Sequence, residues 1–232
     1  MEKQHFDYEP NFLTVEGDQV RICFDVEHTT EERGPIGGVE PVEVEVIKAY
    51  SVRISQPLTF SNIVDTLVRA FYTADEEFAI QRQKDDKPGD YNHYNAWVEK
   101  LKAIAHRVLE GDSLDTMKGI KIAELGIYDA SEAVNCFYIG NQAMWLSPDR
   151  RSNLKNAVEA LKASGVSTVA FMGQTIPVDD ALAMLSAIES YAAMTTFVTD
   201  THRAAIEALE TIEAVDDYDF TIGYPEKLSF QP

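Results

Sequence analysis

Hydrophobic and polar residues alternate with a period of two near the start of the chain. The alternation over Val20–Val26, and again over Val42–Val46, predicts two half-buried β-strands. A third strand is expected over Tyr50–Ile54. Between the first two strands, His28–Glu40 is charged and then rich in glycine and proline, which favours a long loop. Residues 12–54 therefore predict a small, mostly antiparallel sheet with one acidic face in water.

Helical periodicity replaces this alternation over residues 59–111, where apolar residues three and four apart predict three helices. Thr73 and Glu76 form the sequence pattern of a capping box, in which each side chain bonds the backbone amide of the other. The segment Asp85–Asp90 separates the second helix from the third. The third helix is expected to end at Gly111, because glycine commonly follows a helix C-terminus.

The second half of the chain contains clear turn and cap signals. Cys136–Leu146 predicts a hairpin around Gly140-Asn141, and Ser147-Pro148 predicts the start of a helix that runs to about Gly165. Thr168–Val178 predicts a second hairpin, turning at Gly173-Gln174. Asp179 is then expected to cap the longest helix of the chain.

These elements predict an α+β fold with a domain boundary at Gly111–Ser113. Residues 1–111 would form an antiparallel sheet with three packed helices. Residues 112–232 would contain the two hairpins and a long amphipathic helix that resembles a coiled-coil strand.

The long helix carries the most regular pattern in the sequence, a stripe of residues spaced alternately four and three apart. We consider two interpretations: an amphipathic helix packed inside its own domain, or a seam shared between chains, in which polar residues would set the register. Thr211 is expected to cap a short following helix, so that the stripe ends near its last member. The candidate interaction seam consists of Met184, Ile188, Tyr191, Thr195, Val198, His202, Ala205 and Leu209.

Composition and charge exclude several classes of function. The 232 residues include 20 Lys and Arg against 39 Asp and Glu, a formal net charge of −19. Nucleic acids and anionic membrane surfaces would be repelled by such a chain. The sequence contains no uninterrupted apolar run of about 18 residues, the length that a spanning helix needs. Met1–Asp7 lacks the apolar core of a signal peptide, so we expect synthesis in the cytoplasm. Cys23 and Cys136 are expected to be reduced core residues.

Candidate sites for phosphate or metal binding are weak. Gly34-Pro35-Ile36-Gly37-Gly38 lacks the Lys-Ser/Thr pair of a phosphate loop and precedes a strand, so we interpret it as a loop. His28 lies close to Glu31 and Glu32, but no second His or Cys follows at metal-ligand spacing. Asp216, Asp217 and Asp219 do not match the spacing of a calcium loop.

No catalytic motif is present, and we expect no catalytic residue, no cofactor and no metal ligand. His202, on the apolar stripe, is interpreted as a packed histidine, and Cys136 as a structural thiol. An active site built from scattered carboxylates would leave no local pattern, so a carboxylate-based hydrolase stays one alternative. A second alternative is an acidic mimic of DNA that inhibits a host protein. The charge is divided almost equally between the two halves of the chain, as in ordinary acidic proteins.

Four segments of the second half together resemble an uncharacterised domain found at the C-terminus of tailed-phage and prophage proteins, including those of phages that infect Bacteroides-type gut bacteria. The resemblance covers about residues 120–230. Its most specific parts are the MWL-x-x-x-x-R junction and the YDFTIGYP ending. The segments are Met144–Arg151, Ala181–Ala192, Thr199–Arg203 and Tyr218–Leu228.

The resemblance implies a non-enzymatic structural or tail-assembly protein whose partners are other protein subunits, either copies of itself or tail components. It implies synthesis in the cytoplasm of a bacterial host and leaves open incorporation into the virion. It assigns no catalytic or binding residue. On physical grounds, we expect Trp145 to anchor the hairpin to the helix that follows, and Tyr224-Pro225 to form a stiff turn that folds the tail onto the helices.

Overall fold

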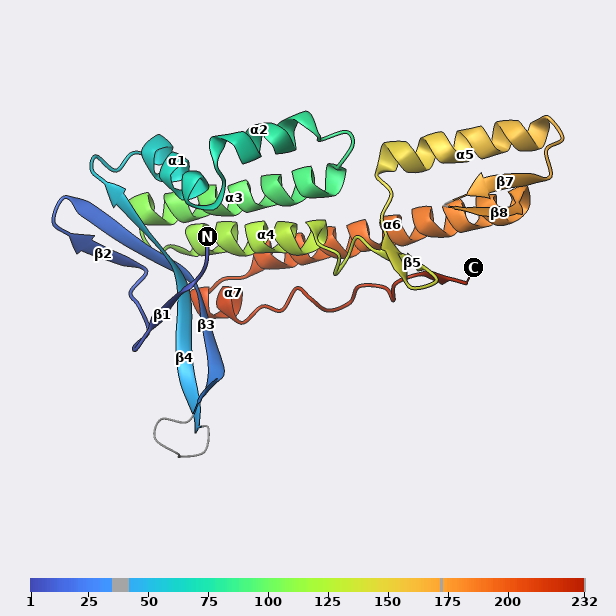
Figure 1. The fold of residues 1–232 in the computed structure, drawn as a ribbon. Helices are drawn as coiled ribbons and strands as arrows, with labels where there is room; N and C mark the ends of the chain where they lie inside the picture. Colours follow the sequence, from blue (N-terminus) through green and yellow to red (C-terminus); the bar gives the residue numbers. More distant parts are fainter. Residues whose placement is uncertain (35–41, 172, 232) are drawn as a thin grey trace. The chain divides into compact units, whose positions relative to one another are not determined.

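The computed structural model describes residues 1–34, 42–171 and 173–231 (Figure 1). The chain forms two compact units, one of Met1–Gln81 with Leu101–Thr116 and the other of Arg82–Lys100 with Met117–Pro232. Helices α3 (Pro88–Glu110) and α4 (Leu114–Ala130) each contribute residues to both units. The predicted boundary at Gly111–Ser113 therefore lies within the first unit. The α+β fold class is confirmed.

The first unit is built on an antiparallel sheet in the order β1-β4-β3-β2. Its strands are β1 (Gln4–Phe6), β2 (Leu13–Glu16), β3 (Gln19–Arg33) and β4 (Val42–Ser55). The sequence prediction was wrong in two respects. Strand β4 is continuous where two strands were expected, and β3 continues to Arg33, so the first part of the predicted loop is strand. Cross-strand pairing with the valines of β4 outweighs the charge of this segment. The glycine-rich part, at 35–41, lies outside the described residues.

A bulge divides β3 into a basal and a distal half. Phe24 pairs with Tyr50 and Glu27 pairs with Lys48, so two residues of β3 lie opposite one residue of β4. Asp25 has a φ of 54°, in the left-handed region that aspartate tolerates better than most residues. The bulge ends the alternation predicted by sequence, because Val26, one of its two residues, is 37% exposed.

The helices of the first unit match their sequence signals. In α1 (Phe60–Phe71), the ring of Phe71 packs on Tyr50 and Phe24, with centroid distances of 4.8 and 6.1 Å. The capping box before α2 (Ala74–Arg82) is confirmed: the Thr73 amide donates to Glu76 Oε2 at 2.7 Å, and the Glu76 amide donates to Thr73 Oγ1 at 3.2 Å. Helix α3 ends before Gly111, whose φ is 81°.

The second unit contains both predicted hairpins. They are β5 (Phe137–Ile139) with β6 (Gln142–Met144), and β7 (Thr168–Phe171) with β8 (Gln174–Pro177). Ser147 caps α5 (Pro148–Ala163), as predicted, by accepting from the Arg150 amide. Thr211 likewise caps α7 (Ile212–Asp216). Near the C-terminus, β9 (Ser229–Phe230) pairs in parallel with β5 and was not predicted.

The long helix, α6 (Val178–Ala208), begins two residues earlier than a cap at Asp179 implies. Pro177 occupies its N-cap position and no side chain caps it, so the prediction that Asp179 is the cap was wrong. Asp179 lies in the first turn and pairs with Lys162. Helix α6 packs with α5 and the two hairpins around a core of Phe137, Leu146, Val158, Val169, Phe171, Val178, Ala181, Leu185 and Ile188.

Candidate interaction site

The candidate seam on α6 is largely covered by the second unit itself. Ile188, Tyr191, Thr195 and His202 are buried, and the remaining members are half-buried. The most buried stripe has the same alternating spacing as the seam, but in a neighbouring register. It consists of Val178, Ala181, Leu185, Ile188, Ala192, Thr195, Thr199, His202 and Ile206. The structure thus uses this face of α6 for packing within one chain.

His202 holds the C-terminal tail, residues 217–231, against α6. Its Nδ1 lies 2.8 Å from the Tyr218 hydroxyl, and its Nε2 lies 2.9 Å from the carbonyl oxygen of Ile222. A carbonyl oxygen only accepts, so Nε2 carries the proton and, in the neutral ring, Nδ1 accepts from Tyr218. The ring also stacks on Tyr224, with centroids 5.8 Å apart. The interpretation of His202 as a packed histidine therefore fits its contacts.

Thr199 links the same tail to α4. Its hydroxyl donates to Asp129 Oδ1 at 2.7 Å and lies 2.9 Å from the Tyr224 hydroxyl, which must then be the donor to Thr199. Burial raises the pKa of Asp129, and the hydrogen bond from Thr199 partly opposes that effect. Thr199 thus joins the Asp129 carboxylate to the Tyr224 hydroxyl, while the nearby His202 imidazole bonds Tyr218 and Ile222 instead.

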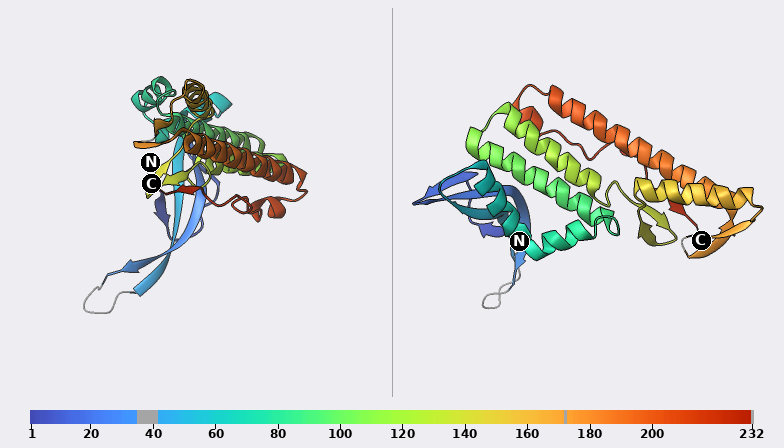
Figure 2. Two further views of the ribbon diagram at one scale, coloured as in Figure 1. Left: turned by 90° about the vertical axis from the view of Figure 1, so that its right-hand side faces the viewer. Right: turned by 90° about the horizontal axis from the view of Figure 1, so that it is seen from above.

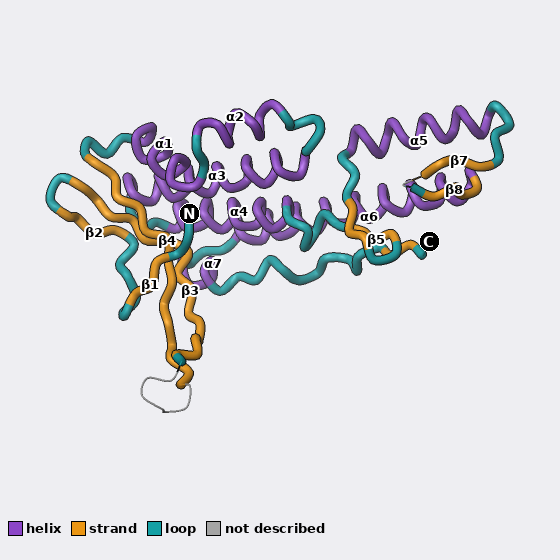
Figure 3. Tube along the Cα trace, viewed as in Figure 1, coloured by secondary structure: helices purple, strands orange, loops and turns teal. Residues whose placement is uncertain are grey.

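The tail is also held at its beginning and at its end. Lys121 of α4 donates to the backbone carbonyl of Asp216 at 2.8 Å. After Tyr224-Pro225 the chain runs back beside α6 and reaches β5, where Leu228 and Phe230 accept backbone hydrogen bonds (Figure 3). The YDFTIGYP segment noted in the sequence therefore contacts other parts of the same chain.

The MWL-x-x-x-x-R motif has a comparable internal role. The guanidinium of Arg151 lies over the indole ring of Trp145, 5.4 Å from its centroid. Arg151 is buried; its Nη1 donates to the carbonyl of Leu146 at 2.7 Å and its Nε to Glu189 of α6 at 2.8 Å. Trp145 also meets Phe137 and Tyr191 ring to ring. Trp145 and Arg151 together tie the hairpin, the start of α5 and α6.

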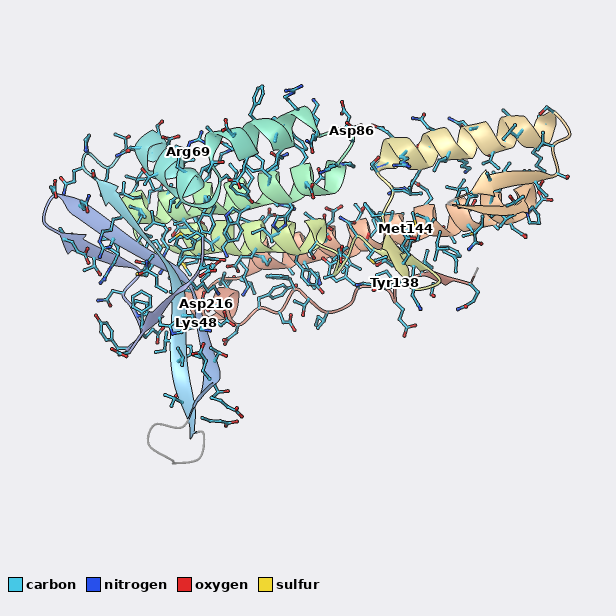
Figure 4. All side chains as sticks on the ribbon, in the orientation of Figure 1. Lys48, Arg69, Asp86, Tyr138, Met144 and Asp216 are labelled. Atoms are coloured by element: carbon cyan, nitrogen blue, oxygen red, sulfur yellow. The ribbon has the colours of Figure 1, made fainter. Side chains whose placement is uncertain are left out.

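Two cavities of the second unit adjoin Trp145. The larger, of about 760 Å³, is lined in part by the α2–α3 loop, where Asp86 lies, and by the start of α5 (Figure 4). The smaller, of about 380 Å³, is lined in part by Cys136 and Glu132. Three acids line the larger cavity, Asp85, Asp86 and Asp149, and all three are exposed. A general acid requires a desolvated or specifically paired carboxyl, which these exposed residues do not provide.

Across the described ranges, no group of three His, Cys, Asp or Glu residues is placed to hold a metal ion. His28, considered above as a ligand, instead lies 3.7 Å from Glu45 across the hairpin. Both cysteines are buried, and neither forms a disulfide.

The distal halves of β3 and β4 form a two-stranded extension, which we call the distal ribbon (Glu27–Arg33 with Val42–Val46; Figures 1 and 2). Strand β2 pairs with β3 only over Gln19–Ile22, and β1 pairs with β4 only over Ile47–Ala49. Among the described residues, no third strand pairs with either outer edge of the ribbon. Its edges therefore offer backbone donors and acceptors to another polypeptide.

The distal ribbon is also acidic. Lys3 pairs with Glu27 at 3.1 Å, and Lys48 at the base of the ribbon pairs with Glu31 at 2.5 Å (Figure 4). Glu32 lies directly opposite Glu43, and no ion pair joins either carboxylate to a cation among the described side chains. Like charges in directly opposed positions destabilise a strand pair, so the Glu32–Glu43 pair is unfavourable for the ribbon.

Comparisons with protein-family models, with curated proteins and with solved structures find no match to this chain. Within the described residues, α6 has the length and apolar composition that a membrane-crossing helix needs, and a third of the relevant stretch is buried in the chain. The sequence expectation considered uninterrupted apolar runs, and in this helix serines, threonines and Glu189 interrupt the apolar residues. Core helices pass the same criterion, so composition alone does not indicate a membrane.

Proposed function

We propose that this chain is a non-enzymatic assembly protein of the tailed-phage kind, and that the distal ribbon is the element that binds its partner. The observation that carries the proposal is the ribbon itself: within the described part of the chain, no strand pairs with its two outer edges and no cation pairs with Glu32 or Glu43. An unpaired edge can accept an added strand from another polypeptide, which supplies backbone hydrogen bonds. The carboxylates favour a partner segment that carries Lys or Arg.

The charge of the ribbon also disfavours pairing between two copies of this chain. Edge strands of stable proteins often carry charges that prevent edge-to-edge association. Here Glu27, Glu31, Glu32, Glu43 and Glu45 would face the same residues of a second ribbon. The ribbon is therefore suited to a different protein of opposite charge. The phage context of the proposal rests on the sequence resemblance alone.

The hydrogen bonds that the most distinctive polar residues form within the chain support a non-enzymatic function. Thr199 is hydrogen-bonded to Asp129 and Tyr224, and His202 to Tyr218 and Ile222. Arg151 is hydrogen-bonded to Leu146 and Glu189. A catalytic group must direct at least one polar atom toward a substrate, and these groups direct theirs toward the chain.

Binding to the products of neighbouring genes tests the proposal. Each neighbouring protein is purified and its affinity for this chain is measured by biolayer interferometry at low and high salt. We expect at least one tail or baseplate protein to bind, and the Glu32→Lys/Glu43→Lys variant to weaken that binding at least about tenfold. The control is Glu159→Lys/Glu210→Lys, which makes the same charge change at two other exposed sites.

Two outcomes would overturn the proposal. One is equal binding by the ribbon variant and the control variant. The other is that the chain binds only a nucleic-acid-binding host protein and that DNA competes with it, which would indicate the DNA-mimic alternative.

A further inference from the structure

Helix α6 has a second apolar face, opposite its buried stripe. At 100° per residue, Phe197 lies diametrically opposite the buried residues Ile188 and Ile206. Phe197 is 68% exposed and Met194 is 47% exposed. A helix that is apolar on both sides normally has both sides covered, and the described chain covers only one. The second face consists of Ala193, Met194, Phe197, Thr201, Ala204 and Ala208, all exposed.

Large and small residues are separated along this face. Met194 and Phe197 lie toward its N-terminal end, and alanines and one threonine follow. Thr201, Ala204, Ala205 and Ala208 have the spacing i, i+3, i+4, i+7, which outlines the hole that receives one knob in knobs-into-holes packing. All four side chains are small, so the hole is wide enough for an aromatic ring.

We propose that the second face of α6 pairs with the same face of a second copy of this chain, with the two helices antiparallel. A two-fold axis near Thr201 would place Phe197 of each copy in the hole of the other. Met194 would then lie on Ala205 and Ala208 of the second copy. The two-fold axis places the large residues of each copy against the small residues of the other. The same surface patch can therefore pair with itself, as an isologous interface requires.

Charge along the face agrees with this arrangement. Asp200 and Arg203 lie on the same flank of the face, and neither forms an ion pair within the described residues. In the antiparallel pair, Arg203 of each copy lies nearly level with Asp200 of the other. The axis also brings the two Asp200 side chains toward each other, and the two arginines neutralise them. A parallel pair would place like charges level with one another and both Phe197 rings against each other.

A lipid surface fits the same face less well. Glu189, Asp200 and Glu207 flank it, and the chain carries a net charge of −19, so anionic headgroups would repel it. Four of the six residues of the face are alanine or threonine, whose burial in lipid contributes little. Small residues do allow two helix axes to approach to about 8 Å, which favours helix pairing.

Sedimentation of the full chain over a range of concentrations tests the proposal. We expect a reversible dimer, and we expect Phe197→Glu to weaken self-association at least about 30-fold, the loss typical of a central aromatic anchor. Phe78→Glu changes another exposed phenylalanine, on α2, and should leave the dimer intact. Ala204→Trp fills the hole from an exposed position and should also give monomers. A native chain that stays monomeric at every concentration overturns the proposal.

Cysteine cross-linking tests the antiparallel orientation. Ala193→Cys and Ala208→Cys are prepared as separate proteins; mixed, they should form a disulfide between copies, whereas each alone should not. Native Cys23 and Cys136 are buried and should not react. Cross-linking of either variant with itself would contradict the orientation. Flotation with phosphatidylcholine vesicles that is lost in Phe197→Glu would identify the face as membrane-binding and overturn self-association.

Self-association through α6 does not depend on the distal ribbon. Phe197→Glu is expected to leave the intrinsic affinity of the ribbon for its partner unchanged, and Glu32→Lys/Glu43→Lys is expected to leave the dimer unchanged. The two proposals can therefore fail separately.

Discussion

Glu32 lies directly opposite Glu43 in the distal ribbon, and no cation among the described side chains pairs with either carboxylate. Replacing one of them should therefore stabilise the ribbon. We expect Glu43→Lys to contribute about 0.2–1 kcal/mol to local stability, because it converts a repulsive cross-strand pair into an attractive one. The measurement is amide hydrogen exchange in ribbon peptides, which should slow.

The same substitution should weaken partner binding, so stability and function change in opposite directions. Glu43→Gln, which removes the repulsion without adding a cation, should give a smaller slowing of exchange. If exchange in the ribbon is unchanged or faster in Glu43→Lys, the repulsion inferred between Glu32 and Glu43 is not present.

Arg151 is predicted to be essential to the stability of the second unit. Arg151→Met keeps most of the apolar stem but leaves the carbonyl of Leu146 without this donor, and the unfolding free energy should fall by about 1–3 kcal/mol. Urea denaturation measures the change. Arg150→Met, at the exposed neighbouring position, is the control and should change stability by less than about 0.5 kcal/mol. Equal effects of the two substitutions would rule out a fastening role for Arg151.

Thr199 should be the most sensitive residue of the tail contacts. Thr199→Val preserves shape but removes the hydroxyl that joins Asp129 to Tyr224, at a cost of about 1–3 kcal/mol. Thr196→Val removes an exposed hydroxyl one turn away and serves as the control. Limited proteolysis provides a second readout, since release of the tail would expose residues 218–225 to cleavage. A tail that stays protected in Thr199→Val would contradict this prediction.

Asp129 should make the stability of the chain depend on pH. Burial raises its pKa in the folded state, so the folded chain binds this proton more tightly than the unfolded chain. The resulting stabilisation is present below the unfolded pKa of about 4 and is lost as the pH rises through the folded pKa. Asp129→Asn keeps an acceptor for Thr199 and removes the charge.

The variant Asp129→Asn should therefore gain stability relative to the native chain as the pH rises from about 4 to about 7. Urea denaturation of both proteins across this pH range gives the difference between their unfolding free energies. The contributions of the other carboxylates to the pH dependence are the same in both proteins and cancel in this difference. A difference that stays constant with pH, or that changes in the opposite direction, would show that Asp129 is not destabilised by burial.

Local signals in the sequence predicted local structure well. The Thr73–Glu76 box, the Ser147 cap and the Gly140-Asn141 turn each depend on residues within a few positions of one another. Helix α4 was missed because Gly119 and Gly126 interrupt its pattern. The distal ribbon was missed because its charges are typical of loops, whereas pairing with β4 decides its structure.

Long-range contacts could not be predicted. Thr199 is 70 residues from Asp129 and 25 residues from Tyr224 in the sequence, yet it contacts both. No local sequence pattern marks Asp129. The spacing from Trp145 to Arg151 was visible in the sequence, but their stacking depends on how the hairpin meets α5. On α6 the heptad spacing was correct while the most buried register was not, because a helix that is apolar on two sides offers more than one stripe of that spacing.

Hydrogen exchange of the chain with and without its bound partner tests the central claim most directly. If the chain acts by holding another protein through the distal ribbon, peptides from Glu27–Arg33 and Val42–Val46 should gain protection in the complex, and those lining the cavities beside Trp145 should not. Protection confined to the Trp145 cavities, with the ribbon exchanging as in the isolated chain, would contradict the account.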